Sequence, residues 1–403
     1  MKKKMLFCAL MLLGLQQGWA DTTLRQTVRG EKTAVTDKPT VVTLKKTMSV
    51  VAATVVVDGS EVPCQLDDLD GDGSNDELVF LTSHRAGQDL KAVITLKEQG
   101  TQKTYAPRVY AEMLLKHPKQ KSQNGQNTYI SSLTVDGKAN PYECLQHHGA
   151  AFETELTAYR IYFDHRQTVD IYGKYRQGLE LRQTQFYPDS KQKAEGYGDD
   201  ILWVGNTLGL GTLRGWDGKL PQMITDVDRR TQRVLASGPL RTVVEVVDER
   251  WTPAPGLLPL TATIRYTLWA GHRECEVAVL FDRDASAYEF CTGIIHVKGA
   301  TDFTDGQGTR ACWGTDWPVS EKDSAGHKRE TVGLGICVPQ RFFVRDLPAD
   351  ADNYGMVVRP VGRQLNYVIT FCSDNERGFG FHSAEAWFEE MRALRKTISR
   401  AGR

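Results

Sequence analysis

Short apolar runs rich in β-branched residues recur along the chain, and Gly, Asp and Asn separate them. In the first quarter of the sequence these runs cover residues 41–44, 50–57, 77–81 and 92–96. Apolar runs of this length between turn-forming residues are typical of strands joined by tight turns. We therefore predict antiparallel strands over this region.

The same pattern continues to the end of the chain, at residues 157–163, 168–172, 179–187, 241–251, 260–269, 274–281, 293–297, 332–338 and 365–371. No helical segment of ten residues or more separates these runs, which argues against a parallel βαβ sheet and favours stacked antiparallel sheets. Only residues 383–398 have helical spacing, with Ser383 placed to cap the helix and Trp387, Met391 and Leu394 on one face. We predict an all-β fold with a C-terminal helix.

A polar stretch at residues 116–127, rich in Lys, His and Gln, interrupts the strand pattern. Such a stretch is typical of a surface loop or hinge, so we place a domain boundary between residues 99 and 121. The predicted domains are a small β-sandwich at residues 21–115 and a larger β-domain at residues 116–403.

The first twenty residues have the features of a signal peptide. Three lysines follow Met1, residues 5–15 are apolar, and Gly18 and Ala20 are small residues at the positions that a signal peptidase recognises. The apolar run is too short to span a bilayer. We predict cleavage after residue 20, no membrane span, and a periplasmic or secreted protein.

The composition and the net charge exclude several classes of protein. The 403 residues include 40% hydrophobic and 25% charged residues, which excludes intrinsic disorder. The 50 Lys and Arg balance the 50 Asp and Glu, and cleavage would leave 47 basic against 50 acidic residues. A protein without net positive charge has no field to attract nucleic acid, so we predict no such partner. Seven cysteines would remain, and their odd number and wide spacing favour buried free thiols, with room for one bridge.

An acidic loop stands out between the early strands, with Asp68, Asp70, Asp72 and Asp76 at alternating positions around Gly73. Carboxylates at this spacing suit Ca²⁺, and the loop begins like an EF-hand. However, Val79 occupies the position where an EF-hand has its bidentate Glu. A calcium site and a simple Asp/Gly turn both remain open as interpretations.

Ionisable and aromatic residues are densest at residues 146–174. Side chains alternate between the two faces of a strand, so Arg160, Tyr162 and Asp164 share one face. Asp170, Tyr172 and Lys174 share a face of the next strand, and a turn at residues 165–167 would bring the two faces together. Tyrosine rings with carboxylates and an arginine can hold an acidic sugar.

Two adjacent histidines precede these strands. His147 and His148, followed by Glu153 and Glu155, supply groups that can transfer protons near neutral pH. Neighbouring histidines on a strand point to opposite faces, so they could not easily share a metal ion. A solvated His pair without catalytic function is the alternative.

A glycine-rich segment further along carries more candidate binding residues. Tyr197, Asp199 and Trp203 lie in or beside the loop at residues 195–205, which can place them at the rim of a cleft. Trp216, Trp313 and Trp317 also lie in turn-rich sequence. Aromatic residues on loops suit stacking against sugars, whereas packing in the core is the alternative for each.

The segment AFETELTAYRIYFDHRQTVDIYGK, with QLDDLDGDGSNDELVFL before it and EGYGDDILWVGNTLGLG after it, resembles the domain-of-unknown-function 4861 family of exported bacterial proteins. The resemblance covers nearly the whole mature chain. It implies a large antiparallel β-supersandwich like that of galactose mutarotases, and a place in polysaccharide-utilisation systems that process uronate-rich plant or algal glycans. It implies no catalytic assignment.

Our leading hypothesis is an enzyme that acts on uronate-containing oligosaccharides by β-elimination or hydrolysis. Elimination needs a cation to neutralise the substrate carboxylate, a base and an acid. We assign Arg160, with Lys174, as the cation. His147 or His148 is the base, and Tyr162 or Tyr172 is the acid. Hydrolysis would use two carboxylates from Glu153, Glu155, Asp164, Asp170 and Asp199.

Two other functions are open. One is a non-catalytic carbohydrate-binding protein that uses the same groove, and the other is a sugar epimerase or mutarotase. The sequence predicts no cofactor beyond the candidate Ca²⁺, and it leaves the oligomeric state open.

Overall fold

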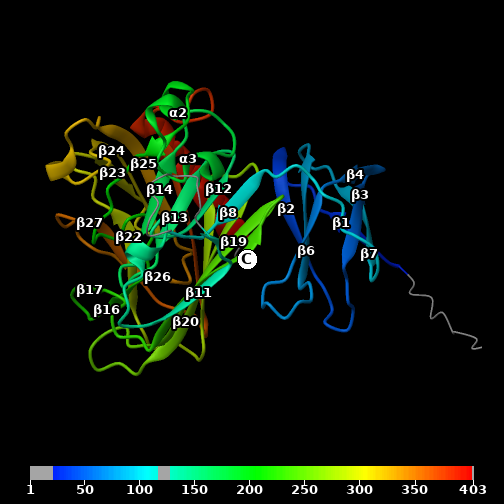
Figure 1. Cartoon of the computed structure of the whole chain (residues 1–403), viewed down its shortest axis with the longest axis horizontal. Coiled ribbons are helices and arrows are strands. Elements are labelled where there is room, and N and C mark those ends of the chain that lie inside the picture. The colour runs from blue at the N-terminus through cyan, green and yellow to red at the C-terminus, as the bar shows by residue number, and fades with distance from the viewer. Residues whose placement is uncertain (1–20, 117–127, 402–403) are drawn as a thin grey trace, which may run out of the picture.

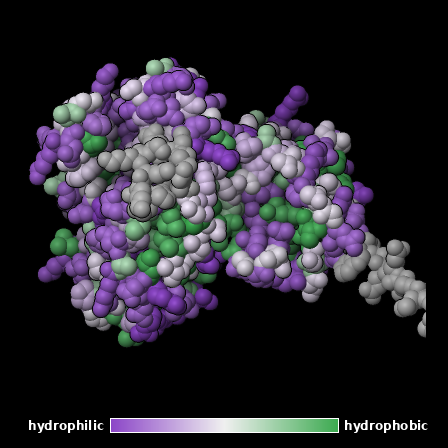
Figure 2. All heavy atoms as spheres, in the orientation of Figure 1, coloured by the Kyte–Doolittle hydropathy of each residue, from purple (hydrophilic) through white to green (hydrophobic). Residues whose placement is uncertain are grey.

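The computed structural model describes residues 21–116 and 128–401 (Figure 1). The predicted signal peptide and residues 117–127 of the predicted hinge loop lie outside the described residues. Two β-rich parts follow each other along the chain, a smaller one drawn in blue and a larger one drawn from cyan to red. Hydrophilic side chains dominate the visible face of both parts, and hydrophobic residues gather there in smaller patches (Figure 2).

The smaller part consists of two antiparallel sheets that enclose a core of their own. One sheet has the order β1 (Thr22–Val28), β7 (Leu90–Lys97), β3 (Ala52–Val57) and β4 (Ser60–Val62), and the other has β2 (Val35–Thr43), β6 (Glu77–His84) and β5 (Cys64–Asp67). Val55 and Ile94 of the first sheet pack with Leu78 and Phe80 of the second, and all four are fully buried. This packing buries one face of each sheet, as a β-sandwich requires.

The larger part contains a nine-stranded antiparallel sheet. Its strands run in the order β11 (Ser132–Asp136), β18 (Arg229–Ser237), β19 (Arg241–Trp251), β20 (Leu260–Trp269), β21 (Cys275–Phe281), β28 (Gln364–Ser373), β25 (Glu330–Cys337), β24 (Thr309–Asp316) and β23 (Thr301–Thr304). A short pair, β9 (Leu114–Leu115) and β10 (Thr128–Tyr129), accompanies it.

Two five-stranded sheets complete the larger part. The first has the order β15 (Asp199–Asp200), β14 (Val169–Gly173), β13 (Ala158–Tyr162), β12 (Gly149–Thr154) and β8 (Val109–Glu112). The second has β17 (Pro221–Gln222), β16 (Arg214–Trp216), β22 (Phe290–Ile295), β27 (Asn353–Val358) and β26 (Phe343–Asp346). Short helical segments are α1 (Leu181–Thr184), α2 (Ser190–Ala194), η1 (Tyr142–Cys144) and η2 (Glu321–Asp323).

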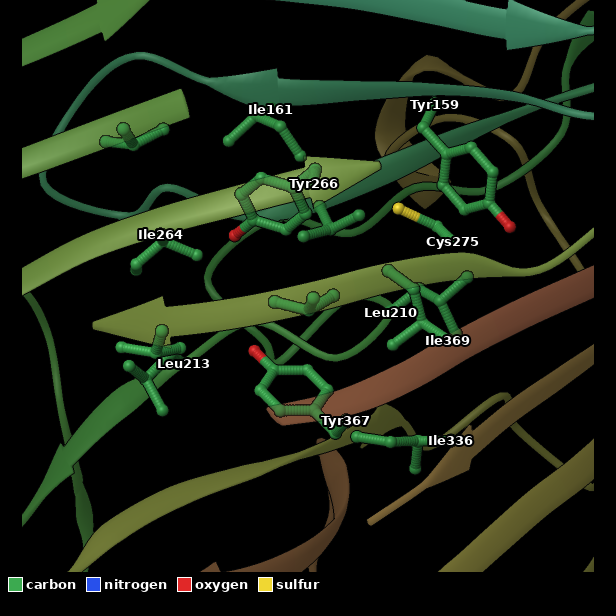
Figure 3. Packing of buried hydrophobic residues seen from close by; sticks show 14 of the residues in the cluster. Tyr159, Ile161, Leu210, Leu213, Ile264, Tyr266, Cys275, Ile336, Tyr367 and Ile369 are labelled. Carbon is green, nitrogen blue, oxygen red and sulfur yellow. The ribbon is translucent and has the colours of Figure 1, made fainter. Parts of the chain in front are cut away.

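The core of the larger part lies between the long sheet and the five-stranded sheets. Figure 3 shows Tyr159 and Ile161 of β13 facing Ile264 and Tyr266 of β20, with Ile369 of β28 beside them. All five side chains are buried. Because side chains alternate along a strand, the inward positions of Tyr159 and Ile161 place the intervening Arg160 on the outer face of β13. The period-two pattern of the sequence thus decides which residues are available outside the core.

The predicted C-terminal helix is confirmed as α3 (Ala384–Ala401). The Ser383 hydroxyl accepts a hydrogen bond from the Ala386 N–H at 3.2 Å, as expected for a cap. Trp387 and Met391 are fully buried against β25. A Cβ atom at Gly335 of that strand would lie only 2.3 Å from the Met391 sulfur. Glycine in β25 therefore lets the helix approach the sheet closely.

The predicted all-β fold with stacked antiparallel sheets and a C-terminal helix is confirmed, but the strand predicted at residues 179–187 is wrong. Residues Leu181–Thr184 form α1, and Gln185 and Phe186 follow with positive φ angles of 47° and 69°. The backbone N–H groups of Glu180 and Leu181 donate hydrogen bonds to the buried Glu153 carboxylate. This tertiary contact turns the chain away from the sheet and overrides its β-propensity.

Arginines connect the two parts. Arg241 of the larger part forms ion pairs with Asp67 and, at 2.7 Å, with Glu77 of the smaller part. Arg108 similarly pairs with Asp37 at 2.7 Å. The apolar residues Val79 and Leu81 on the other face of β6 pack with Trp269 and its neighbours. Strand β6 is thus buried on both sides, which explains why its sequence is a continuous apolar run. The domain limits themselves stay a prediction.

Two further features concern the expected environment of the protein. All seven cysteines in the described residues are free, and six of them are buried. Among the described helices, none is long and apolar enough to cross a membrane.

Candidate functional site

The dense stretch of the sequence forms a polar cluster on the outer face of the first five-stranded sheet. Strands β13 and β14 pair as predicted, with Arg160 opposite Asp170. The Arg160 guanidinium binds Asp170 at 2.6 Å and 2.9 Å, Asp200 at 2.9 Å and the Tyr187 hydroxyl at 2.7 Å. The Tyr162 hydroxyl donates to Asp170 at 2.7 Å. We call these five residues the Arg160 cluster.

The charges of the Arg160 cluster neutralise one another within the protein. The Arg160 side chain is 4% exposed and that of Asp170 is 1% exposed. The Phe186 ring covers the guanidinium at 4.2 Å. Burial raises the pKa of the Asp200 carboxyl well above its usual range, and the nearby Arg160 opposes this rise. The donors of Arg160 are therefore committed to internal partners.

The two predicted histidines point in different directions, as we expect for adjacent residues. His148 lies beside the cluster, where its ring stacks on Tyr142 at 3.7 Å and contacts Tyr162 edge-on at 6.1 Å. Burial lowers the pKa of His148 to about 4, so the ring is neutral at pH 7. His147 is fully buried elsewhere, with Nε2 at 2.7 Å from the Glu112 carboxylate. Only His148 therefore adjoins Arg160 and its partners.

Two of the predicted catalytic and binding residues form a buried ion pair. The Lys174 ammonium binds the Glu153 carboxylate at 2.5 Å, and both side chains are fully buried. Tyr172 is also fully buried, against the Phe186 ring at 5.2 Å. These three side chains stabilise the loop that carries α1. They are not exposed to a ligand.

The other predicted residues are distributed over separate contacts. Glu155 binds Arg108 at the junction of the two parts, and Asp164 pairs with the neighbouring Arg166 at 2.6 Å. The Arg176 guanidinium lies over the Tyr197 ring at 4.4 Å. Asp199 pairs with Lys193 of α2. Of the predicted residues between 146 and 174, the structure brings together Arg160, Tyr162, Asp170 and His148. It places the others in separate contacts: His147, Glu153, Glu155, Asp164, Tyr172 and Lys174.

Trp203 lies in a groove and follows β15, the edge strand of the first five-stranded sheet. The groove has a volume of about 640 Å³, and its aromatic and ionisable lining residues are Trp203, Trp317, His296, Lys298, Asp316, Glu321 and Asp352. We call it the Trp203–Trp317 groove. The Trp203 side chain is 52% exposed, and its ring packs over Gly205, where a Cβ atom would lie 3.2 Å from it. Glycine at this position, with a φ angle of 47°, lets the ring lie flat on the loop.

The groove presents polar groups that are not all used by the protein. Lys298 is exposed, and no carboxylate of the described chain forms an ion pair with its ammonium group. His296 is held by the Asp350 carbonyl, which lies 2.6 Å from its Nδ1. Arg329 lies over the Trp317 ring at 5.5 Å. The groove thus combines aromatic surface with a free cation and carboxylates.

Sequence reasoning identified Trp203 and noted Trp317, but it missed Lys298, His296 and Asp316. These residues lie about a hundred positions from Trp203 and belong to strand ends that meet only in the folded sheet. The turn-rich sequence around Trp317 was the one available signal. Of the other tryptophans named with it, Trp216 is 6% exposed and packs in the core. Trp313 is half-buried and packs with the residues under α3.

The acidic loop contains a lysine among its carboxylates. Oxygen atoms of Asp68, Asp70 and Asp76 lie within 4.8 Å of one another, close enough to hold a cation. The Lys46 ammonium contacts Asp70 at 2.7 Å, Asp72 at 3.0 Å and Asp76 at 2.7 Å. The donor atoms fit a calcium ion, but Lys46 supplies a positive charge at the same place. Calcium binding stays a prediction.

Two of the solved structures that match this chain have low similarity to it. An α-mannosidase from Enterococcus faecalis V583 matches with a TM-score of 0.35 and 10% identity, over 94% of this chain and 44% of that chain. A glycosyl hydrolase family 38 protein from Enterococcus faecalis matches with a TM-score of 0.38 and 11% identity, over 94% and 45%. This chain therefore spans less than half the length of either protein.

No curated protein matches the sequence at a significant level. A family model, in contrast, matches residues 29–402, which is most of the chain. The description of that model is a domain of unknown function. On this match the protein belongs to the DUF4861 family.

Proposed function

We propose that this protein is an exported carbohydrate-active protein that binds uronate-containing oligosaccharides in the Trp203–Trp317 groove. The observation that carries the proposal is the pairing of an exposed tryptophan with an unpaired lysine in one groove of about 640 Å³. This volume lies within the usual range for ligand sites.

The chemistry of the groove suits an acidic sugar. The indole rings of Trp203 and Trp317 offer flat apolar surface for the faces of pyranose rings. Asp316 and Asp352 can accept hydrogen bonds from sugar hydroxyls. Lys298 supplies a positive charge for a uronate carboxylate. This local charge is needed because the chain as a whole has balanced charge and does not attract anions.

Elimination that uses Arg160 as the neutralising cation has no support from the geometry. Elimination was assigned to Arg160 as the neutralising cation, but Asp170 and Asp200 already neutralise this guanidinium. A non-catalytic binding protein is the second candidate, because the groove residues serve binding without any reaction. An epimerase has no observation of its own in its favour.

Binding to the mature protein, beginning at residue 21, tests the proposal. Pectic, ulvan-like and gum-type oligosaccharides would be titrated while tryptophan fluorescence is followed. Trp203→Ala should weaken binding by about tenfold or more, because loss of a central aromatic contact typically costs about 2 kcal/mol. Trp203→Phe should retain most of the affinity.

Leu220→Ala is the matched control, since Leu220 is also an exposed apolar side chain, at 63%, but lies outside the groove. Equal affinity in wild type and Trp203→Ala would contradict the proposed site. Absorbance near 235 nm would detect the unsaturated product of elimination, whereas new reducing ends without absorbance would indicate hydrolysis.

A further inference from the structure

The imidazole of His296 is held in one orientation at the wall of the Trp203–Trp317 groove. The residue is half-buried and lines the groove. Its backbone N–H donates a hydrogen bond to the Asp352 carbonyl at 2.8 Å, and its ring centroid lies 4.4 Å from that of Tyr354. The ring Nδ1 lies 2.6 Å from the Asp350 carbonyl oxygen. Contacts of both the backbone and the ring therefore fix the position of this side chain.

This arrangement decides which ring nitrogen of His296 is available. A carbonyl oxygen only accepts hydrogen bonds, so Nδ1 carries the proton that it shares with Asp350. In the neutral ring, Nε2 then has the lone pair. No group of the described chain forms a hydrogen bond with Nε2 of His296. A neutral imidazole whose second nitrogen is free can act as a general base.

A cation follows two residues later on the same wall of the groove. Lys298 is exposed, and its backbone N–H donates a hydrogen bond of 3.5 Å to the Asp316 carboxylate. The Trp317 backbone N–H donates to the same carboxylate at 2.8 Å. Backbone groups thus bind Asp316, and the Lys298 ammonium forms no ion pair with a carboxylate of the described residues.

The chain itself keeps the histidine and the lysine close together. Consecutive Cα atoms are about 3.8 Å apart, so the Cα atoms of His296 and Lys298 lie within about 7.6 Å of each other. Both side chains line one groove, whose indole rings can hold the sugar chain. The free Nε2 and the free ammonium can therefore reach the same sugar residue.

We propose that the groove cleaves 4-linked uronates by β-elimination, with His296 as the base and Lys298 as the cation that neutralises the uronate carboxylate. This inference rests on the proposed function and names the reaction and the substrate class of the same groove. It assigns the two roles to side chains whose reactive atoms have no partner in the described chain, unlike the guanidinium of Arg160.

The step is balanced without water, an oxidant or a metal. The Lys298 ammonium binds the uronate carboxylate, which makes the proton on C5 more acidic. Nε2 of His296 takes this proton, a double bond forms between C4 and C5, and the bond from C4 to the glycosidic oxygen breaks with its electron pair on the oxygen. The imidazolium then returns the proton to that oxygen. The products are a saccharide with an unsaturated uronate and a saccharide with a new reducing end.

The direct test is His296→Ala, assayed on pectic, ulvan-like and gum-type oligosaccharides by the ultraviolet absorbance of the unsaturated product. The kcat should fall at least about 100-fold, while binding stays within about threefold of wild type. Added imidazole should restore part of the rate, because a free base can replace the lost ring but cannot repair a packing defect. His327→Ala, at an exposed histidine outside the groove, is the control and should retain the wild-type rate.

Methyl esters of the same oligosaccharides test the role of Lys298. An ester has no charge to neutralise, so Lys298→Met should lower kcat at least about tenfold on the free acid but less than about threefold on the ester. Lys322→Met, at an exposed lysine outside the groove, should behave as wild type on both substrates. Equal losses on acid and ester would overturn the role of Lys298.

Each remaining outcome also decides the proposal. Binding without any product in wild type, or new reducing ends without an unsaturated product, would overturn elimination and leave the binding groove in place. A wild-type rate in His296→Ala would overturn the role of His296. Absence of binding in wild type would overturn the proposed function as well, and it is seen before any rate is measured. His296→Gln provides a second variant if His296→Ala does not fold.

Discussion

The Arg160 cluster and the Trp203–Trp317 groove contain the same kinds of side chain but arrange them differently. In the cluster, Arg160 binds Asp170, Asp200 and Tyr187 with its side chain only 4% exposed. In the groove, Trp203 is 52% exposed and Lys298 has no acidic partner in the described chain. The cluster pairs its arginine with its own carboxylates, whereas the groove leaves a cation available for a ligand.

This contrast shows what a dense polar motif means in a sheet. Adjacent strands bring alternate residues together, so complementary charges at matching positions bind one another. Removing such groups from water is costly unless they are paired, and the pairing then uses their binding capacity. A sparse set of unpaired groups on strand ends and loops is therefore the better indicator of a site.

The largest expected effect is loss of stability when the cluster is broken. Arg160→Met would leave Asp170 and Asp200 without their cation in a buried place, so the free energy of unfolding should fall by about 3–5 kcal/mol. Urea denaturation measures this change. Arg25→Met, at an exposed position of β1, should change it by less than about 0.5 kcal/mol. A stable Arg160→Met protein that no longer binds oligosaccharides would place the site in the cluster instead.

The next effect is a pH dependence of stability from His148. Its ordinary pKa is 6.5, and burial lowers this to about 4 in the folded protein. The unfolded chain therefore binds a proton at a higher pH than the folded one, and stability should fall as pH decreases from 6.5 to 4. Between pH 6.5 and 4, the free energy of unfolding of His148→Asn should fall by about 2 kcal/mol less than that of the wild type. This value allows for partial solvent screening.

Asparagine is the appropriate replacement because His148 has a positive φ of 60°, which Asn tolerates. Denaturation midpoints of both proteins at several pH values provide the measurement. An unchanged slope between pH 4 and 6.5 in the variant would show that another group titrates there.

The sequence predicted the elements of the fold better than the site. The alternation around Tyr159 and Ile161 correctly separated the core face of β13 from its polar face, because burial of one face imposes period two. The strand expected at residues 179–187 failed, because hydrogen bonds to Glu153, some thirty residues earlier, determine the local backbone. Local pattern carries no information about such a partner.

The same limit applies to the candidate site. Asp170 and Arg160 could be placed together because one turn joins their strands. Lys298 and Asp316 could not be associated with Trp203, since their proximity depends on how separate sheets stack. Exposure is equally hidden in the sequence, where Trp216 and Trp203 both lie in turn-rich segments but only one is exposed.

A smaller effect is expected in the groove itself, where Lys298 distinguishes acidic from neutral sugars. Lys298→Met should weaken binding of uronate-containing oligosaccharides about threefold to fivefold, because an exposed ion pair contributes about 1 kcal/mol or less. Neutral oligosaccharides should bind the variant as they bind wild type. The difference should shrink in high salt, which screens exposed charges. Titrations at two salt concentrations test this, and equal weakening for both ligand classes would exclude a charge-specific role.

The smallest effect concerns the acidic loop, where Lys46 and a calcium ion would compete for the same carboxylates. Calcium should change the melting temperature of the wild-type protein little, because an ion must first displace the lysine. Lys46→Met leaves Asp68, Asp70 and Asp76 unneutralised, so calcium should stabilise this variant measurably against a chelator control. Asp70→Asn in the same background should abolish the gain. A large calcium effect in wild type would show that the loop binds the ion despite Lys46, and no effect in Lys46→Met would identify the loop as a turn alone.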